Sequence, residues 1–142
     1  NDRRLRYPDH GEIWNHAFQV QEQGELFAKL SWRSEAFSYL YEKSFSLEGE
    51  KLRIRYRICN PGREEIPCIW TWHGLMRYDA AKLPYLGGWI TAGDFQGDYN
   101  CSLEPPSGFY DKVSRARTLK TLPVLGSGEE TEFELALSLE EL

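Results

Sequence analysis

The stretch LRIRYRICNPGREEIPCIWTWH, residues 52–73, carries the clearest structural pattern in this sequence. Apolar side chains at every second position of residues 52–58 alternate with arginines, which predicts a β-strand with one buried face and one face in water. The Asn-Pro-Gly sequence at 60–62 predicts a turn, because proline presets φ and glycine tolerates a positive φ. The apolar run 68–72 predicts a second strand that ends at His73. A strand end is a place where a rigid scaffold can present a titratable group to a ligand.

Further strand-like stretches lie on both sides of this segment. Alternating or apolar patterns predict strands at residues 18–23, 26–33, 37–47, 84–91, 101–104 and 131–139, and residues 113–122 fit either a short helix or an extended strand. Many short strands separated by turns favour an antiparallel sandwich or barrel. The sequence therefore predicts an all-β, antiparallel β-sandwich, with residues 1–142 as a single domain.

Composition narrows the classes of partner. The net charge of −5, from 22 acidic and 17 basic residues, argues against nucleic acid or an anionic membrane as the main partner. No apolar run approaches the ~18 residues that a membrane span requires. The three cysteines form no CxxC pair and suit a reducing compartment, so a cytoplasmic location is expected.

Two histidines and one carboxylate are the candidates for acid–base chemistry. His10, His73 and Glu104 are each predicted at a strand end or in an adjoining turn. A carboxylate and an imidazole can move protons in opposite directions across a small substrate. The alternative is structural: His73 as a hydrogen-bonded strand-end residue, His10 as a turn residue, and Glu104 as a rim charge beside a proline turn.

Three tryptophans are candidate substrate-binding residues. Alternation places Trp70 and Trp72 on the same face, and with Trp89 they suit a sugar site, because the C–H faces of a pyranose can pack on an indole. The alternative is a tryptophan-rich core, which we favour for at least one of the three. The acidic residues around Gly97 do not have the spacing of an EF-hand, so no metal site is expected.

Three blocks of the sequence resemble the aldose 1-epimerase (galactose mutarotase) superfamily, and more particularly its uncharacterised bacterial branch. The blocks are residues 8–14 (PDHGEIW), 60–73 with the ending WTWH, and 84–105, which begins PYLGGW. His10, His73 and Glu104 match, in order, the first histidine, the second histidine and the late glutamate of the family pattern.

This resemblance implies a galactose mutarotase-like supersandwich with a sugar-binding cleft and no cofactor. It implies that Glu104 is the general base for the anomeric hydroxyl, that His73 is the acid for the ring oxygen, and that His10 assists by hydrogen-bonding the substrate. A small-molecule sugar is the expected partner.

The sequence is shorter than the family pattern, with segments missing before His10 and between His73 and Pro84. We therefore expect an incomplete or shortened sandwich, whose exposed sheet edges invite pairing with another copy of the chain. Three functions follow as alternatives: an epimerase acting on a hexose-type sugar, a non-catalytic carbohydrate-binding domain, and a structural fragment that completes its sheet in an oligomer.

Overall fold

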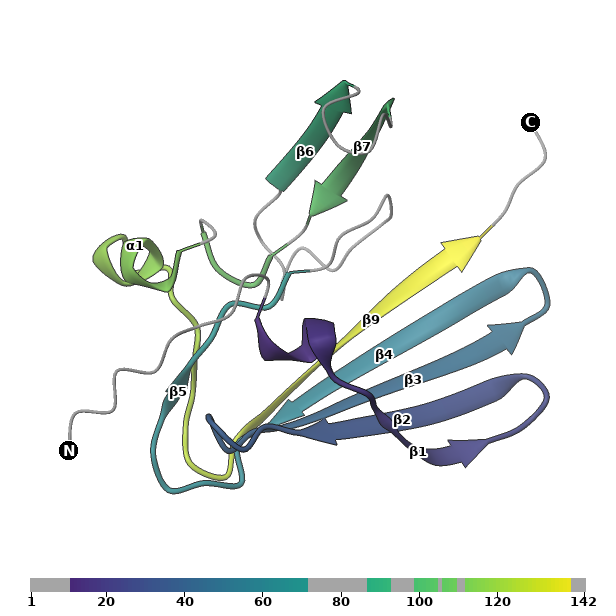
Figure 1. The fold of residues 1–142 in the computed structure, drawn as a ribbon, viewed down its shortest axis with the longest axis horizontal. Helices are drawn as coiled ribbons and strands as arrows, with labels where there is room; N and C mark the ends of the chain where they lie inside the picture. Colours follow the sequence, from purple (N-terminus) through teal and green to yellow (C-terminus); the bar gives the residue numbers. More distant parts are fainter. Residues whose placement is uncertain (1–10, 72–86, 93–98, 105, 110–111, 139–142) are drawn as a thin grey trace.

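A computed structural model describes residues 11–71, 87–92, 99–104, 106–109 and 112–138 of the chain (Figure 1). Within these residues lie a 3-10 helix, an α-helix and a series of mostly short strands. The elements are η1 (Glu12–Asn15), β1 (Gln19–Gln23), β2 (Phe27–Arg33), β3 (Leu40–Glu48), β4 (Lys51–Cys59), β5 (Ile66–Pro67), β6 (Gly87–Ala92), β7 (Tyr99–Glu104), α1 (Val113–Thr118), β8 (Val124–Leu125) and β9 (Glu130–Ser138).

The largest sheet has five strands in the order β1-β2-β3-β4-β9. Its first four strands form an antiparallel meander, and β9 returns from the C-terminal part of the chain to pair with β4 (Figure 1). Every residue of β4 pairs with both β3 and β9. The predicted all-β, antiparallel class is confirmed. Within the described residues β1 and β9 are the edges of this sheet, and pairing of an edge with another copy remains a prediction.

One face of the five-stranded sheet carries the core. Ile54, Tyr56 and Ile58 of β4 are at most 7% exposed. The register places Leu135 opposite Ile54 and Phe133 opposite Tyr56, so β4 and β9 bury their apolar side chains together. Burying large apolar side chains in this way is the main favourable contribution to folding. The predicted buried face of the central strand is therefore confirmed.

The opposite face of β4 carries the three arginines. Arg55 lies opposite Glu134, and Arg57 lies opposite Glu132. The side chain of Arg55 is 70% exposed. This is the predicted solvated face, and opposite charges on paired strands stabilise it modestly.

The second half of the 52–73 stretch differs from the prediction. Among its described residues, only Ile66 and Pro67 form a strand, β5, which pairs with β8. Residues 68–70 form no strand, and Thr71 makes an isolated bridge with Pro106. The reason is that β3 and β9 occupy both edges of β4, so a returning strand has no free edge there.

A buried asparagine organises the turn after β4. The side-chain amide of the fully buried Asn60 donates to the carbonyl oxygens of Glu64 at 2.7 Å, Leu125 at 2.9 Å and Gly126 at 3.0 Å. Its Oδ1 accepts a hydrogen bond of 3.0 Å from the Gly62 N–H. The predicted turn is confirmed, and the amide of Asn60 fastens it to the segment between β8 and β9.

The smaller elements lie beyond this turn. β6 and β7 form an antiparallel pair, and residues 113–118 form the helix α1 around the fully buried Ala116. Of the two structures predicted for residues 113–122, a short helix or an extended strand, the helix is therefore the one that forms, over residues 113–118. No helix in the described part of the chain is long and apolar enough to cross a membrane.

Candidate functional site

Glu104 is the last residue of β7 and lies opposite Gly87 of β6. The two residues that follow it in sequence are prolines, which lack the N–H that a sheet ladder needs, so the strand ends there. The Glu104 side chain is partly exposed. This is the predicted strand-end position for a carboxylate.

The segment after Glu104 pairs with the segment that leads to His73. Thr71 and Pro106 form an antiparallel bridge. Beside it, the Ser107 N–H donates to the Trp70 carbonyl oxygen at 2.8 Å, and the Trp70 N–H donates to the Ser107 hydroxyl at 3.0 Å. His73 itself lies outside the described residues.

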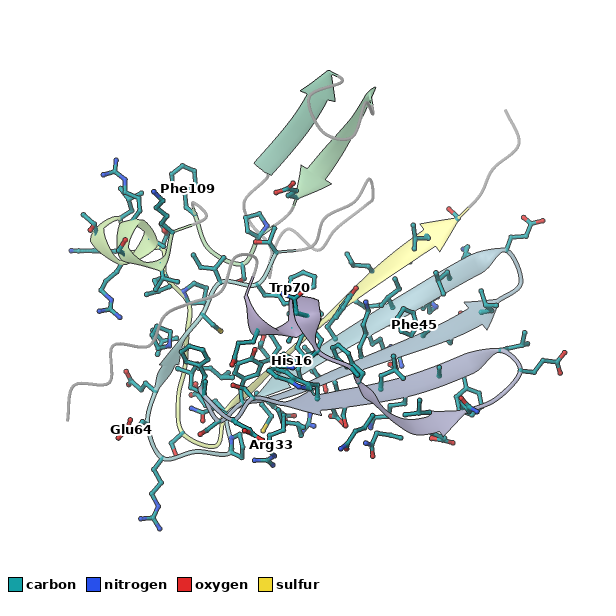
Figure 2. The ribbon with its side chains drawn as sticks, in the orientation of Figure 1. His16, Arg33, Phe45, Glu64, Trp70 and Phe109 are labelled. Carbon is teal, nitrogen blue, oxygen red and sulfur yellow. The ribbon has the colours of Figure 1, made fainter. Side chains whose placement is uncertain are left out.

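The indole of Trp70 belongs to the core and lies over the apolar face of the sheet (Figure 2). Trp70 is 7% exposed, and its ring centroid lies 4.8 Å from that of Tyr56 and 4.0 Å from that of Phe133. Its Nε1–H donates to the Tyr41 hydroxyl at 3.2 Å. Burial raises the pKa of Tyr41, so its phenol stays neutral. Trp70 thus fits the core interpretation that the sequence left open for at least one tryptophan.

The segment that follows His10 is anchored to the β2–β3 connection. Gly11 has a φ of 79°, a conformation that residues with a side chain rarely adopt. The buried Ser34 hydroxyl donates to Oε2 of Glu12 at 2.6 Å. Burial raises the pKa of Tyr39, and the neighbouring Glu12 carboxylate raises it further. The sequence patterns did not reveal this anchor, because its residues are 22 or more positions apart.

The other predicted site residues are less defined. His10 and Trp72 lie outside the described residues, as His73 does. Trp89 lies in β6 opposite Ser102. The roles of these four residues remain predictions.

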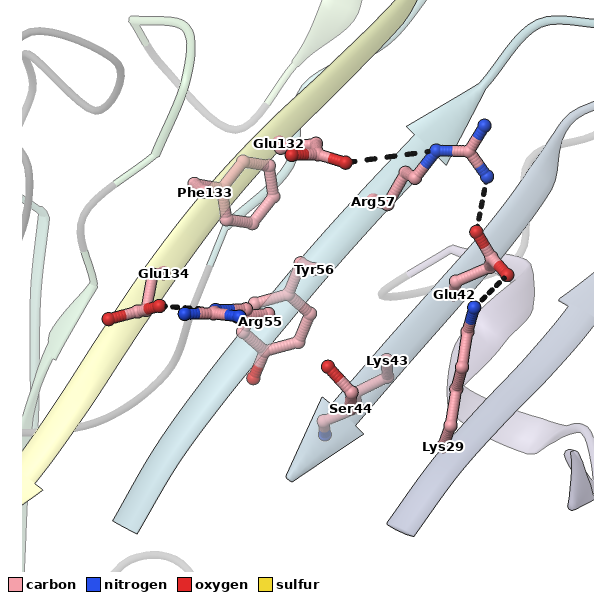
Figure 3. A pocket seen from close by; sticks show the side chains of 10 residues that line it. All are labelled: Lys29, Glu42, Lys43, Ser44, Arg55, Tyr56, Arg57, Glu132, Phe133 and Glu134. Atoms are coloured by element: carbon pink, nitrogen blue, oxygen red, sulfur yellow. Dashed lines mark hydrogen bonds and ion pairs between the residues drawn. The ribbon is translucent and has the colours of Figure 1, made fainter. Parts of the chain in front are cut away.

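A groove of about 270 Å³ crosses the charged face of the large sheet (Figure 3). It is lined by Lys29, Glu42, Lys43, Ser44, Arg55, Tyr56, Arg57, Glu132, Phe133 and Glu134. Glu42 pairs with Lys29 at 3.1 Å and with Arg57, and a hydrogen bond from Arg55 lowers the pKa of Glu134. Most of the charges in this groove are thus paired with one another, and neither Glu104 nor Trp70 lines it. We interpret it as a structural ion-pair network.

Metal ligands do not gather in the described part of the chain. No group of three or more His, Cys, Asp or Glu side chains there could hold a metal ion. Cys59 and Cys68 are free thiols, and burial raises the pKa of the Cys68 thiol, which keeps it protonated and unreactive.

No protein-family model and no curated protein matches the sequence. Solved structures do resemble the fold. A candidate aldose 1-epimerase from Escherichia coli K12 aligns with a TM-score of 0.72 and 18% identity, over 94% of this chain and 72% of its own. A galactose mutarotase related enzyme from Lactobacillus acidophilus aligns with a TM-score of 0.73 and 10% identity, over 95% of this chain and 75% of its own.

A third structure, of a Synechocystis protein, aligns with a TM-score of 0.71 and 16% identity, over 94% of this chain and 69% of its own. The predicted resemblance is therefore confirmed at the level of the fold. Together with the antiparallel sheets described above, these similarities establish that the chain has the β-sandwich fold of the aldose 1-epimerase and galactose mutarotase-like proteins, and that it spans between 69% and 75% of their length.

Proposed function

We propose that this protein is an aldose 1-epimerase-like enzyme, which binds a hexose-type sugar and interconverts its anomers. The observation that carries the proposal is the position of Glu104, a partly exposed strand-end carboxylate on a segment bridged to the one that leads to His73. The fold supports it, because two of the similar structures are named as an epimerase and a mutarotase-related enzyme. Fold alone does not determine function, so the proposal depends on the site.

The proposed reaction is an acid–base ring opening. Glu104 takes the proton of the anomeric hydroxyl while His73 protonates the ring oxygen, and the C1–O bond of the ring breaks. Rotation about C1–C2 and closure on the other face of the aldehyde return both protons and yield the other anomer. His10 hydrogen-bonds the sugar near the ring oxygen. Imidazole suits the acid role because its unperturbed pKa of about 6.5 lies near neutral pH.

Covalent geometry supports the pairing of Glu104 with His73. Each is two residues along the chain from a member of the Thr71–Pro106 bridge. Consecutive Cα atoms are about 3.8 Å apart, so the chain allows at most about 7.6 Å between the Cα atoms of Glu104 and Pro106, and the same between those of His73 and Thr71. Two groups that act on one sugar ring need to lie close together, and this is the arrangement that the proposal requires.

The test compares three chains in an NMR or polarimetric anomer-exchange assay on freshly dissolved glucose and galactose. The parent should accelerate exchange, and Glu104→Gln should lower kcat by about 100-fold or more, because an amide cannot accept the proton. Glu65→Gln, the same change at an exposed residue between β4 and β5, should behave as the parent does.

Each contrary result has a definite meaning. Full activity of Glu104→Gln would exclude Glu104 as the base. If the parent binds sugar, seen as line broadening of the sugar signals, but does not accelerate exchange, the protein is a carbohydrate-binding domain on the same fold and not an enzyme. If the parent neither binds glucose or galactose nor accelerates their anomer exchange, the proposal is overturned.

A further inference from the structure

Two reciprocal hydrogen bonds join Trp70 to Ser107. The Ser107 N–H donates to the Trp70 carbonyl oxygen at 2.8 Å, and the Trp70 N–H donates to the Ser107 Oγ at 3.0 Å. A side-chain hydroxyl thus takes the place of a backbone carbonyl as acceptor. We call this pair of bonds the Trp70–Ser107 clamp. An alanine at position 107, which has no side-chain acceptor, could make only one of the two bonds.

Trp70 ties the clamp to the large sheet. Its indole lies against Tyr56 of β4 and Phe133 of β9, and its Nε1–H bonds to Tyr41 of β3. A side chain held in this way by three strands has little freedom to move. The backbone of Ser107 is therefore connected, through Trp70, to the five-stranded sheet.

Close packing beside the clamp limits movement further. A Cβ atom on Gly108 would lie 2.9 Å from Cδ of Pro123 and 3.1 Å from Cγ1 of Ile69, which is closer than side-chain atoms normally approach. The backbone of Gly108 therefore fits tightly between these two residues, so the segment around Ser107 has one well-defined position.

Glu104 lies between two points of attachment. On its N-terminal side, β7 pairs with β6, where Glu104 is opposite Gly87. On its C-terminal side, Ser107 is only three residues away and is held to Trp70 by the clamp. The β6–β7 pair alone would fix the carboxylate relative to β6. The clamp fixes it relative to the large sheet.

We infer that Ser107 is a positioning residue for Glu104, which holds the carboxylate at its working distance from the rest of the site through the Trp70–Ser107 clamp. This inference rests on the proposed epimerase function. Displacing a catalytic group by about 1 Å can lower a rate by about 100-fold, so the loss of one hydrogen bond three residues away is expected to be measurable. The same inference gives Trp70 a positioning role, because its backbone N–H and carbonyl bind Ser107 while its indole is fixed in the core.

The test uses Ser107→Ala, which removes the acceptor for the Trp70 N–H and leaves the other bond of the clamp. In the anomer-exchange assay we expect kcat to fall by about 10-fold or more, with KM changed by less than about twofold. Ser107→Thr keeps the hydroxyl and should restore most of kcat. Ser127→Ala is the matched control, because its hydroxyl bonds to the Gly62 carbonyl oxygen at 2.8 Å, in a turn outside the clamp, and its kcat should equal that of the parent.

Amide hydrogen exchange provides a second readout that needs no activity. In Ser107→Ala, the amides of Trp70 and of Glu104 should exchange at least about 10-fold faster than in the parent, and in Ser127→Ala they should not. If the parent fails to epimerise sugars, the proposed function falls, and this exchange pattern still decides whether Ser107 holds the Glu104 segment. Unchanged exchange at Glu104 together with unchanged kcat in Ser107→Ala would overturn the inference.

Discussion

The five-stranded sheet and the region that follows it are held together in different ways. In the sheet, every residue of β4 is paired on both sides. In the crossover region, which we define as the described residues from 60 to 125, β6 pairs with β7 alone, β5 and β8 pair over two residues, and a single bridge joins Thr71 to Pro106. The sheet distributes its stability over many equivalent contacts, whereas the crossover region depends on a few particular side chains.

This difference suits a division between scaffold and site. Glu104 belongs to the crossover region, and His73 lies two positions after Thr71 of that region in the sequence. Functional residues commonly lie on irregular segments that a rigid scaffold positions. Here the contacts between scaffold and site are few enough to be removed one at a time, so the comparison can be tested by single substitutions.

The largest loss of stability is expected within the sheet itself. Leu135→Ala truncates a fully buried side chain in β9 and leaves a cavity opposite Ile54. The free energy of unfolding should fall by about 3 kcal/mol, measured by chemical denaturation. The matched control Val124→Ala, at a side chain that is 49% exposed, should cost less than about 1 kcal/mol. Equal losses in the two variants would show that the β4–β9 core is not the main source of stability.

A single polar side chain should matter almost as much in the crossover region. Asn60→Ala removes the donor to three carbonyl oxygens, those of Glu64, Leu125 and Gly126. Because a buried acceptor without a partner is costly, the free energy of unfolding should fall by about 2 kcal/mol. Asn15→Ala, at an exposed position in η1, should change it by less than about 0.5 kcal/mol. If Asn60→Ala proves as mild as this control, the crossover region does not depend on individual side chains.

The smallest effect is expected on the charged face of the sheet. Burial opposes ionisation of Glu42, but hydrogen bonds from Arg57 and Lys29 outweigh it, so the pKa of Glu42 lies below that of an ordinary glutamate. A carboxylate with a depressed folded-state pKa adds stability above its unfolded pKa, and this contribution is lost as pH falls through the folded value. Glu42→Gln should therefore cost up to about 1 kcal/mol at pH 7 and progressively less below about pH 4.5.

Thermal unfolding at a series of pH values measures this difference. Glu65→Gln, at an exposed residue between β4 and β5, serves as the control and should match the parent at every pH. A constant deficit of Glu42→Gln down to pH 2 would indicate lost packing and not a lost ion pair.

Prediction from the sequence succeeded where local pattern and burial agree. The alternation in β4 and β9 predicted both strands and the faces that they bury, because a period of two places every second side chain on one side of a sheet. It failed at residues 68–70, whose apolar and β-branched side chains have the propensity of a strand but no partner edge beside β4. Strand propensity does not reveal which edges the rest of the chain already occupies.

The candidate site shows the same boundary. The end of β7 at Glu104 was predictable, because Pro105 and Pro106 cannot extend a ladder. The Ser34–Glu12 hydrogen bond and the Trp70–Ser107 clamp were not predictable, because the first joins residues 22 positions apart and the second joins residues 37 positions apart. No local pattern marks a serine as the partner of a distant backbone amide.

Alternation, turn residues and charge were sufficient on their own to establish an antiparallel all-β chain, the buried face of its central strand and a carboxylate at a late strand end. Each of these depends on interactions between neighbours in sequence. Only the tertiary structure decided that β9 pairs with β4, that Trp70 lies in the core, and that Ser107 holds the segment after Glu104. The physical reason is that pairing of distant segments depends on which edges and cavities remain after the other segments have packed, and that information is spread over the whole chain.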